Sequence, residues 1–121
     1  MKEQDRALRL WLEDIVAWGR RLATYVSTTS EGDFLVDNLR QDAVVRCLEC
    51  IGEASRRVMS FEANGLPKHI EFLEAYWARN RFAHGYFDLD MSRVWLTATV
   101  SAPKLVADVE QLLKTLPDPH S

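Results

Sequence analysis

The residues best suited to chemistry lie together in one segment, Arg79-Asn80-Arg81-Phe82-Ala83-His84-Gly85-Tyr86. Arginine binds phosphate oxygens through paired hydrogen bonds, and histidine titrates near neutral pH and can transfer protons. Asparagine can orient either side chain. This composition is what a site for handling a phosphodiester would use. The alternative is that cations favour any helix C-terminus, where each gains about 0.3–1 kcal/mol from the helix dipole.

The spacing within this segment determines how its side chains could meet. Asn80 and His84 are four residues apart and would share one face of a helix. Arg79 and His84 are five apart, which is about 140° around an ideal helix. We therefore expect them to converge only if the last helical turn unwinds. Gly85 is placed to allow this, because glycine adopts backbone conformations that other residues avoid.

Four helical segments are predicted from apolar residues that recur at spacings of three and four. They cover approximately residues 4–27, 33–61, 68–84 and 90–116. Their short connections favour antiparallel packing. The sequence therefore predicts an all-α protein, an up-and-down bundle of four to five helices.

Several residues predict where these helices begin and end. Ser30 followed by Asp33 is typical of a helix start, and a break near Asp37-Asn38 is expected. One helix is predicted to end, and the next to begin directly at the proline, in the segment Asn64-Gly65-Leu66-Pro67.

In the last segment, Asp90 or Ser92 is the expected N-cap. Pro103 should kink or split the helix near Ser101, because proline lacks the backbone N–H.

Length and composition limit the possible classes of protein. The chain has 121 residues, which predicts a single domain over 1–121 with a frayed tail from about residue 117. No apolar run approaches the roughly 20 residues that cross a bilayer. The first residues lead into an amphipathic pattern rather than a signal peptide. We therefore expect a cytoplasmic protein that does not engage a membrane.

The formal net charge of −3 argues against a strongly basic coat for tight, non-specific duplex binding. Cys47 and Cys50 form a Cys-x-x-Cys pair inside a helical pattern, with no second pair to complete a zinc site. We expect buried thiols and neither a metal site nor a cofactor. Gly52 in the same helix predicts close approach of a neighbouring helix.

Other residues have weaker claims to function. Asp14 and Glu53 could hold Arg79 or His84, although solvated helix charges explain these carboxylates equally well. The tryptophans are expected in the core or at a dimer surface, and are not interpreted as a platform for stacking bases. They are Trp11, Trp18, Trp77 and Trp95.

The segment 79–86 resembles the Arg-x4-His-x-Tyr motif of the HepT-type toxins, in the HEPN ribonuclease superfamily, whose usual form is Arg-Asn-x-x-Ala-His-Gly-Tyr. Leu12-Glu13-Asp14-Ile15 is similar to the family's first-helix signature, and residues 41–54 are similar to its second. The Pro67 restart falls where the family places its third helix. The resemblance covers residues 8–116.

The resemblance implies a HEPN-like homodimer and the toxin of a toxin–antitoxin system, cleaving RNA as a metal-independent endoribonuclease. The motifs would face each other across a two-fold axis. Arg79, Asn80 and His84 would be catalytic, and Arg81 would be either a surface charge or a second phosphate contact. The usual partner is a nucleotidyltransferase antitoxin, MntA, which transfers AMP from ATP to the motif tyrosine, here Tyr86.

Two other interpretations stay open at this point. The chain could be a catalytically inactive HEPN-like helical module that binds a nucleotide or a partner protein. It could also be a structural helical protein whose basic turn is only a capped helix end. Induced expression separates the first from a toxin, because a toxin arrests growth and its His84→Ala form does not.

Overall fold

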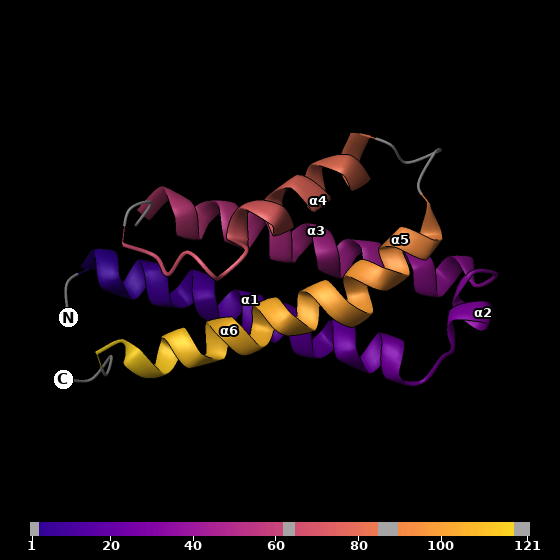
Figure 1. Ribbon diagram of the computed structural model, residues 1–121, viewed down its shortest axis with the longest axis horizontal. Coiled ribbons are helices and arrows are strands. Elements are labelled where there is room, and N and C mark those ends of the chain that lie inside the picture. Colours follow the sequence, from indigo (N-terminus) through magenta and orange to yellow (C-terminus); the bar gives the residue numbers. More distant parts are fainter. Residues whose placement is uncertain (1–2, 62–64, 85–89, 118–121) are drawn as a thin grey trace.

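The computed structural model describes residues 3–61, 65–84 and 90–117, all built from helices and their connections (Figure 1). The side chains of Ala83 and His84 lie outside this description, as do Tyr86 and the tail predicted over 118–121. The elements are α1 (Glu3–Ser27), α2 (Glu31–Phe34), α3 (Asn38–Phe61), α4 (Phe72–His84), α5 (Met91–Leu96), the π-helical segment η2 (Thr97–Ser101) and α6 (Ala102–Thr115). No strand occurs in these ranges, which confirms the predicted all-α class.

The long helices alternate in direction along one axis. α1 packs against α3, α4 packs on the other side of α3, and α6 returns beside α1 (Figure 1). The start of α1 and the end of α6 therefore lie at the same end of the molecule. This arrangement confirms the predicted up-and-down bundle. In the described part of the chain, no helix is long and apolar enough to cross a membrane.

The core is assembled from one apolar face of every helix. Its largest fully buried side chains are Phe34, Leu12, Ile15, Leu22, Ile51, Val44, Val58, Val94 and Val109. Trp11, Trp18 and Trp95 pack at its edge, whereas Trp77 is half exposed. The ring of Phe34 lies 5.2 Å from that of Trp95, so α2 and α5 meet at one end of the bundle.

The predicted break near Asp37-Asn38 is confirmed. The Ser30 hydroxyl accepts a hydrogen bond from the backbone N–H of Asp33 at 3.2 Å and begins α2. The Asp37 carboxylate accepts one from the backbone N–H of Arg40 at 3.0 Å at the start of α3. Each of these side chains satisfies a backbone donor that a helix N-terminus leaves free, which explains why two helices form here instead of one.

The predicted helix restart at Pro67 is wrong, because α4 begins only at Phe72. The backbone N–H of Ile70 bonds to the carbonyl of Pro67 at 3.3 Å, and that of Phe72 bonds to the carbonyl of Ile70 at 3.0 Å. These turns bury the side chains of Ile70 and Phe72. Burial of two large apolar residues thus outweighs the helix-start preference of proline.

The predicted interruption by Pro103 is confirmed and takes the form of η2. Because proline has no backbone N–H, the preceding turn widens. The N–H of Ala102 reaches the carbonyl of Thr97, five residues back. The predicted cap at Asp90 is also present, since its carboxylate accepts from the backbone N–H of Ser92 at 3.0 Å.

Candidate functional site

The position of Arg79 is set by a close approach of α3 and α4 at Gly52. A Cβ atom at Gly52 would lie 2.8 Å from the carbonyl oxygen of Ala75 and would overlap the Cβ of Arg79. The buried glycine therefore lets the backbone of α4 touch α3. This confirms the close approach predicted from a glycine in the middle of a helix.

The Arg79 guanidinium is held by two acceptors. Its Nη1 donates to Oδ1 of Asn80 at 3.2 Å, and its Nη2 lies 3.7 Å from Oε2 of Glu53 on α3. Glu53 also receives Nη2 of Arg56 at 2.8 Å and lies 3.4 Å from Nε of Arg57. Of the two carboxylates considered from the sequence, Glu53 is the one that contacts Arg79.

Glu53 is thus the centre of a cluster of three arginines. The hydrogen bond from Arg56 holds the pKa of the Glu53 carboxyl below its ordinary value, and the charges of Arg56, Arg79 and Arg57 add to this effect. The carboxylate stays ionised and anchors Arg79 as a fixed cation at the surface. Such a cation can bind a phosphate oxygen.

The unwinding predicted for the last turn of α4 does not occur before His84, since the helix continues through that residue. On an ideal helix, positions 79 and 84 are about 140° apart. The side chain of His84 lies outside the described residues, so the convergence of Arg79 and His84 stays a prediction.

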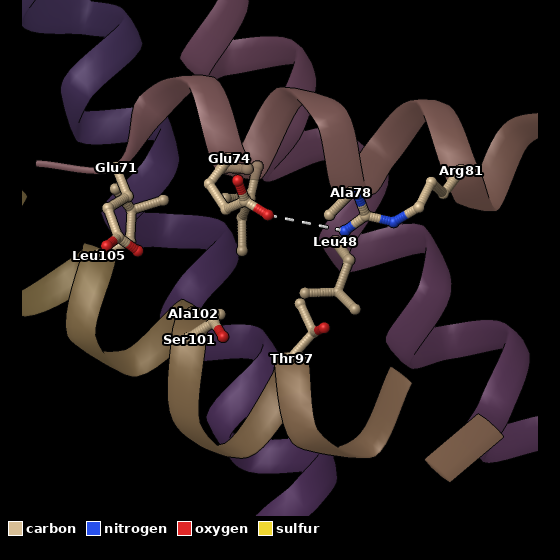
Figure 2. Close-up of a pocket in the computed structure, with 11 residues that line it drawn as sticks. Leu48, Glu71, Glu74, Ala78, Arg81, Thr97, Ser101, Ala102 and Leu105 are labelled. Carbon is tan, nitrogen blue, oxygen red and sulfur yellow. Dashed lines mark ion pairs between the residues drawn. The ribbon is translucent and has the colours of Figure 1, made fainter. Parts of the chain in front are cut away.

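Arg81 lies on a different side of α4 from Arg79, and Figure 2 shows it beside the groove between α4 and α6. Its Nη2 lies 3.9 Å from Oε1 of Glu74, two turns earlier on the same helix. Leu48 and Ile51 of α3 also line this small pocket of about 70 Å³. The structure thus separates two arginines that are only two residues apart in sequence.

A groove on the Arg79 side was missed by sequence reasoning. It has a volume of about 230 Å³ and lies between α1 and α3, with Arg79 of α4 also in its lining. Its lining residues are Trp11, Asp14, Trp18, Arg46, Glu49, Cys50, Glu53 and Arg79. Helical spacing places these residues in one row on α1 and one row on α3. The sequence therefore contains both rows, but only the packing of α1 on α3 shows that they face the same groove.

The two cysteines are free thiols. Burial raises the pKa of the Cys47 thiol to about 11 and also raises that of Cys50. Both stay protonated near neutral pH. Cys47 is buried as predicted, whereas Cys50 is partly exposed at the groove. Among the described residues, no group of three or more His, Cys, Asp or Glu side chains is placed to hold a metal ion.

Comparison with known proteins assigns this arrangement to a family. The family model described as ribonuclease HepT-like matches residues 19–112, which include Arg79 and His84. A protein of Methanocaldococcus jannaschii named "Putative RNase" is 30% identical over 111 residues, covering 92% of this chain and 95% of its own length. A "Probable ribonuclease HepT" of Thermococcus cleftensis is 32% identical over 109 residues, covering 90% and 98%. No solved structure matches the chain.

Proposed function

The chain belongs to the HepT-like ribonuclease family, and from this premise we propose that it is a toxin-type endoribonuclease that cleaves RNA without a metal ion. The observation that carries the proposal is the fixed guanidinium of Arg79, which Asn80 and Glu53 hold on the helix that ends at His84. A cation and an imidazole on one short helix are the groups that metal-free cleavage of a phosphodiester requires.

The proposed reaction uses the 2′-OH of the RNA as nucleophile. His84 of one subunit accepts the 2′-OH proton while the oxygen attacks the adjacent phosphorus. His84 of the second subunit protonates the 5′-oxygen as its bond to phosphorus breaks, which leaves a 2′,3′-cyclic phosphate and a 5′-hydroxyl. Arg79 stabilises the negative charge that develops on the phosphate oxygens. Asn80 keeps Arg79 in place through its Oδ1, and its amide nitrogen is available to orient a histidine.

A homodimer is part of the proposal, because one chain supplies only one motif histidine. The outward face of α4 supports it. Leu73 and Trp77 are 55% and 50% exposed there, and helical spacing places Asn80 and His84 on the same face. Aromatic residues exposed on one face, next to polar groups, are typical of interfaces. A two-fold contact at this face would bring the two motif ends together.

Replacing Trp77 with glutamate should therefore convert the dimer to a monomer and abolish RNA cleavage, because the charge would be buried without a partner in the interface. Sedimentation equilibrium measures the mass of the protein in solution and so distinguishes dimer from monomer. Leu10→Glu is the matched control, since Leu10 is 65% exposed on α1. That variant should keep the mass and the activity of the natural protein. A Trp77→Glu protein that remains a dimer would contradict this assignment.

The function itself is tested by incubating the purified protein with a single-stranded RNA in the presence of EDTA. The RNA should be cut, and DNA of the same sequence should stay intact because it lacks the 2′-OH. A denaturing gel measures both outcomes. Dependence on an added divalent cation, or equal cutting of DNA, would contradict the proposed reaction.

We further propose that the partner is an MntA-like nucleotidyltransferase antitoxin that neutralises the protein by transferring AMP to Tyr86. The added phosphate would lie two residues from His84 in sequence, where its negative charge would compete with RNA for the cations. Incubation with ATP and the antitoxin should give a mass gain of one AMP on the peptide that contains Tyr86, and none on a Tyr86→Phe protein. An unchanged peptide mass, with ribonuclease activity retained, would count against this mode of control.

A further inference from the structure

The groove beside Arg79 has aromatic walls that are paired with cations. Trp11 and Trp18 lie two turns apart on α1 and both line it. The guanidinium of Arg57 lies over the Trp11 ring at 5.6 Å from its centroid, and that of Arg21 lies over the Trp18 ring at 5.1 Å. Alternating aromatic rings and guanidinium groups are typical of surfaces that bind single-stranded nucleic acids, because both stack on bases.

The lining of the groove also includes charged side chains that form no hydrogen bond or ion pair with other described residues. Whereas Glu53 is engaged by arginines, the carboxylates of Asp14 and Glu49 make no ion pair or hydrogen bond within the described residues. The same holds for the guanidinium of Arg46. Carboxylates accept hydrogen bonds and do not donate them. These two groups therefore suit a ligand that presents donors.

The volume of the groove limits the size of that ligand. It is about 230 Å³, below the about 300–1,000 Å³ of pockets that enclose drug-sized molecules. This space suits one flat ring system and not a folded chain. Arg79 lies at the edge of the same groove, where it would meet a phosphate attached to that ring through its sugar.

We propose that the groove between α1 and α3 binds one unpaired, amino-bearing base of the RNA, with the phosphate beside that base held at Arg79. Trp11, Trp18 and their arginines would contact the faces of the base, and Asp14 or Glu49 would accept a hydrogen bond from its amino group. The inference rests on the proposed function, since it assigns a substrate preference to that site.

The carboxylates should make the groove select among the four bases. Adenine, guanine and cytosine each carry an exocyclic amino group that donates hydrogen bonds, whereas uracil has carbonyl oxygens and only one ring N–H donor. A carboxylate would repel those oxygens. The protein should therefore bind oligoadenylate more tightly than oligouridylate.

The test measures binding by a His84→Ala protein, which cannot cleave the oligonucleotide during the experiment. Fluorescence anisotropy with labelled oligoadenylate and oligouridylate gives the two dissociation constants. Oligoadenylate should bind more tightly. Asp14→Asn should reduce the difference, because an amide also donates hydrogen bonds to carbonyl oxygens. Asp14 is exposed on α1, so this substitution leaves the core unchanged.

Two substitutions of one tryptophan test the aromatic wall in the same background. Trp11→Leu keeps an apolar side chain but removes the ring, and should weaken binding of both oligonucleotides about tenfold. Trp11→Phe keeps an aromatic face and should bind nearly as the parent does. Arg93→Ala on α5, away from the groove, should bind unchanged.

Equal affinities for the two oligonucleotides, insensitive to Asp14→Asn, would overturn the proposal. An unchanged affinity in Trp11→Leu would overturn it as well. So would a Trp11→Leu protein whose only defect is a loss of dimer mass, since the groove would then be covered by a second copy of the chain. Failure of the natural protein to cut RNA, with the base preference intact in His84→Ala, would refute the ribonuclease mechanism alone.

Discussion

Replacing His84 with alanine should lower the rate of RNA cleavage by about 10²–10⁴-fold or more, because each proton-transfer role contributes that much. In the proposed dimer, one substitution removes both the base that accepts the 2′-OH proton and the acid that protonates the 5′-oxygen. The dissociation constant for RNA should change little, since Arg79 and the groove persist. Single-turnover rates with excess protein separate these two effects.

His69→Ala is the matched control, because His69 is an exposed histidine in the turns before α4. This variant should cleave RNA at the rate of the natural protein. If His84→Ala kept that rate instead, His84 would have no part in the chemistry and the proposed mechanism would fail.

The second large effect is expected from Gly52→Ala. The new methyl group would overlap the Cβ of Arg79 and lie 2.8 Å from the carbonyl of Ala75, so α4 must move away from α3. Overpacking of this kind costs about 1–3 kcal/mol, against about 1 kcal/mol gained from the helix preference of alanine. A shift of Arg79 by about 1 Å should lower the cleavage rate about 100-fold. Urea unfolding measures the loss of stability, and single-turnover cleavage measures the loss of rate.

Gly19→Ala provides the comparison, because its methyl group would overlap only the side chain of Val106 on α6. It should disturb packing between α1 and α6 and leave the rate of cleavage by folded protein unchanged. Equal losses of activity in the two variants, or none in Gly52→Ala, would show that the α3–α4 contact does not position Arg79.

The sequence predicted the fold well because its strongest signals are local. Helices form where apolar residues recur at helical spacing, and Ser30, Asp37 and Asp90 act on backbone donors only a few residues away. Pro103 likewise acts on the turn that contains it. The Pro67 restart failed because burial of Ile70 and Phe72, a tertiary effect, overrides the local preference.

The candidate site was less predictable because it depends on how helices are rotated against each other. Arg79 and Arg81 are two residues apart in sequence, yet one faces Glu53 of α3 and the other lies beside the groove next to α6. The positions of the tryptophans were also hard to predict from the sequence. Trp11 and Trp18 were expected to serve only as core or dimer surface, and their place in a groove with Arg79 follows from the packing of α1 on α3.

The most direct test of the central claim is the chemistry of the ends that cleavage produces. RNA cut by the purified protein in EDTA should carry a 2′,3′-cyclic phosphate on one fragment and a 5′-hydroxyl on the other, as mass spectrometry of the fragments will show. Fragments with a 5′-phosphate and a 3′-hydroxyl would mean that water attacked the phosphorus, and would contradict the mechanism assigned to Arg79 and His84.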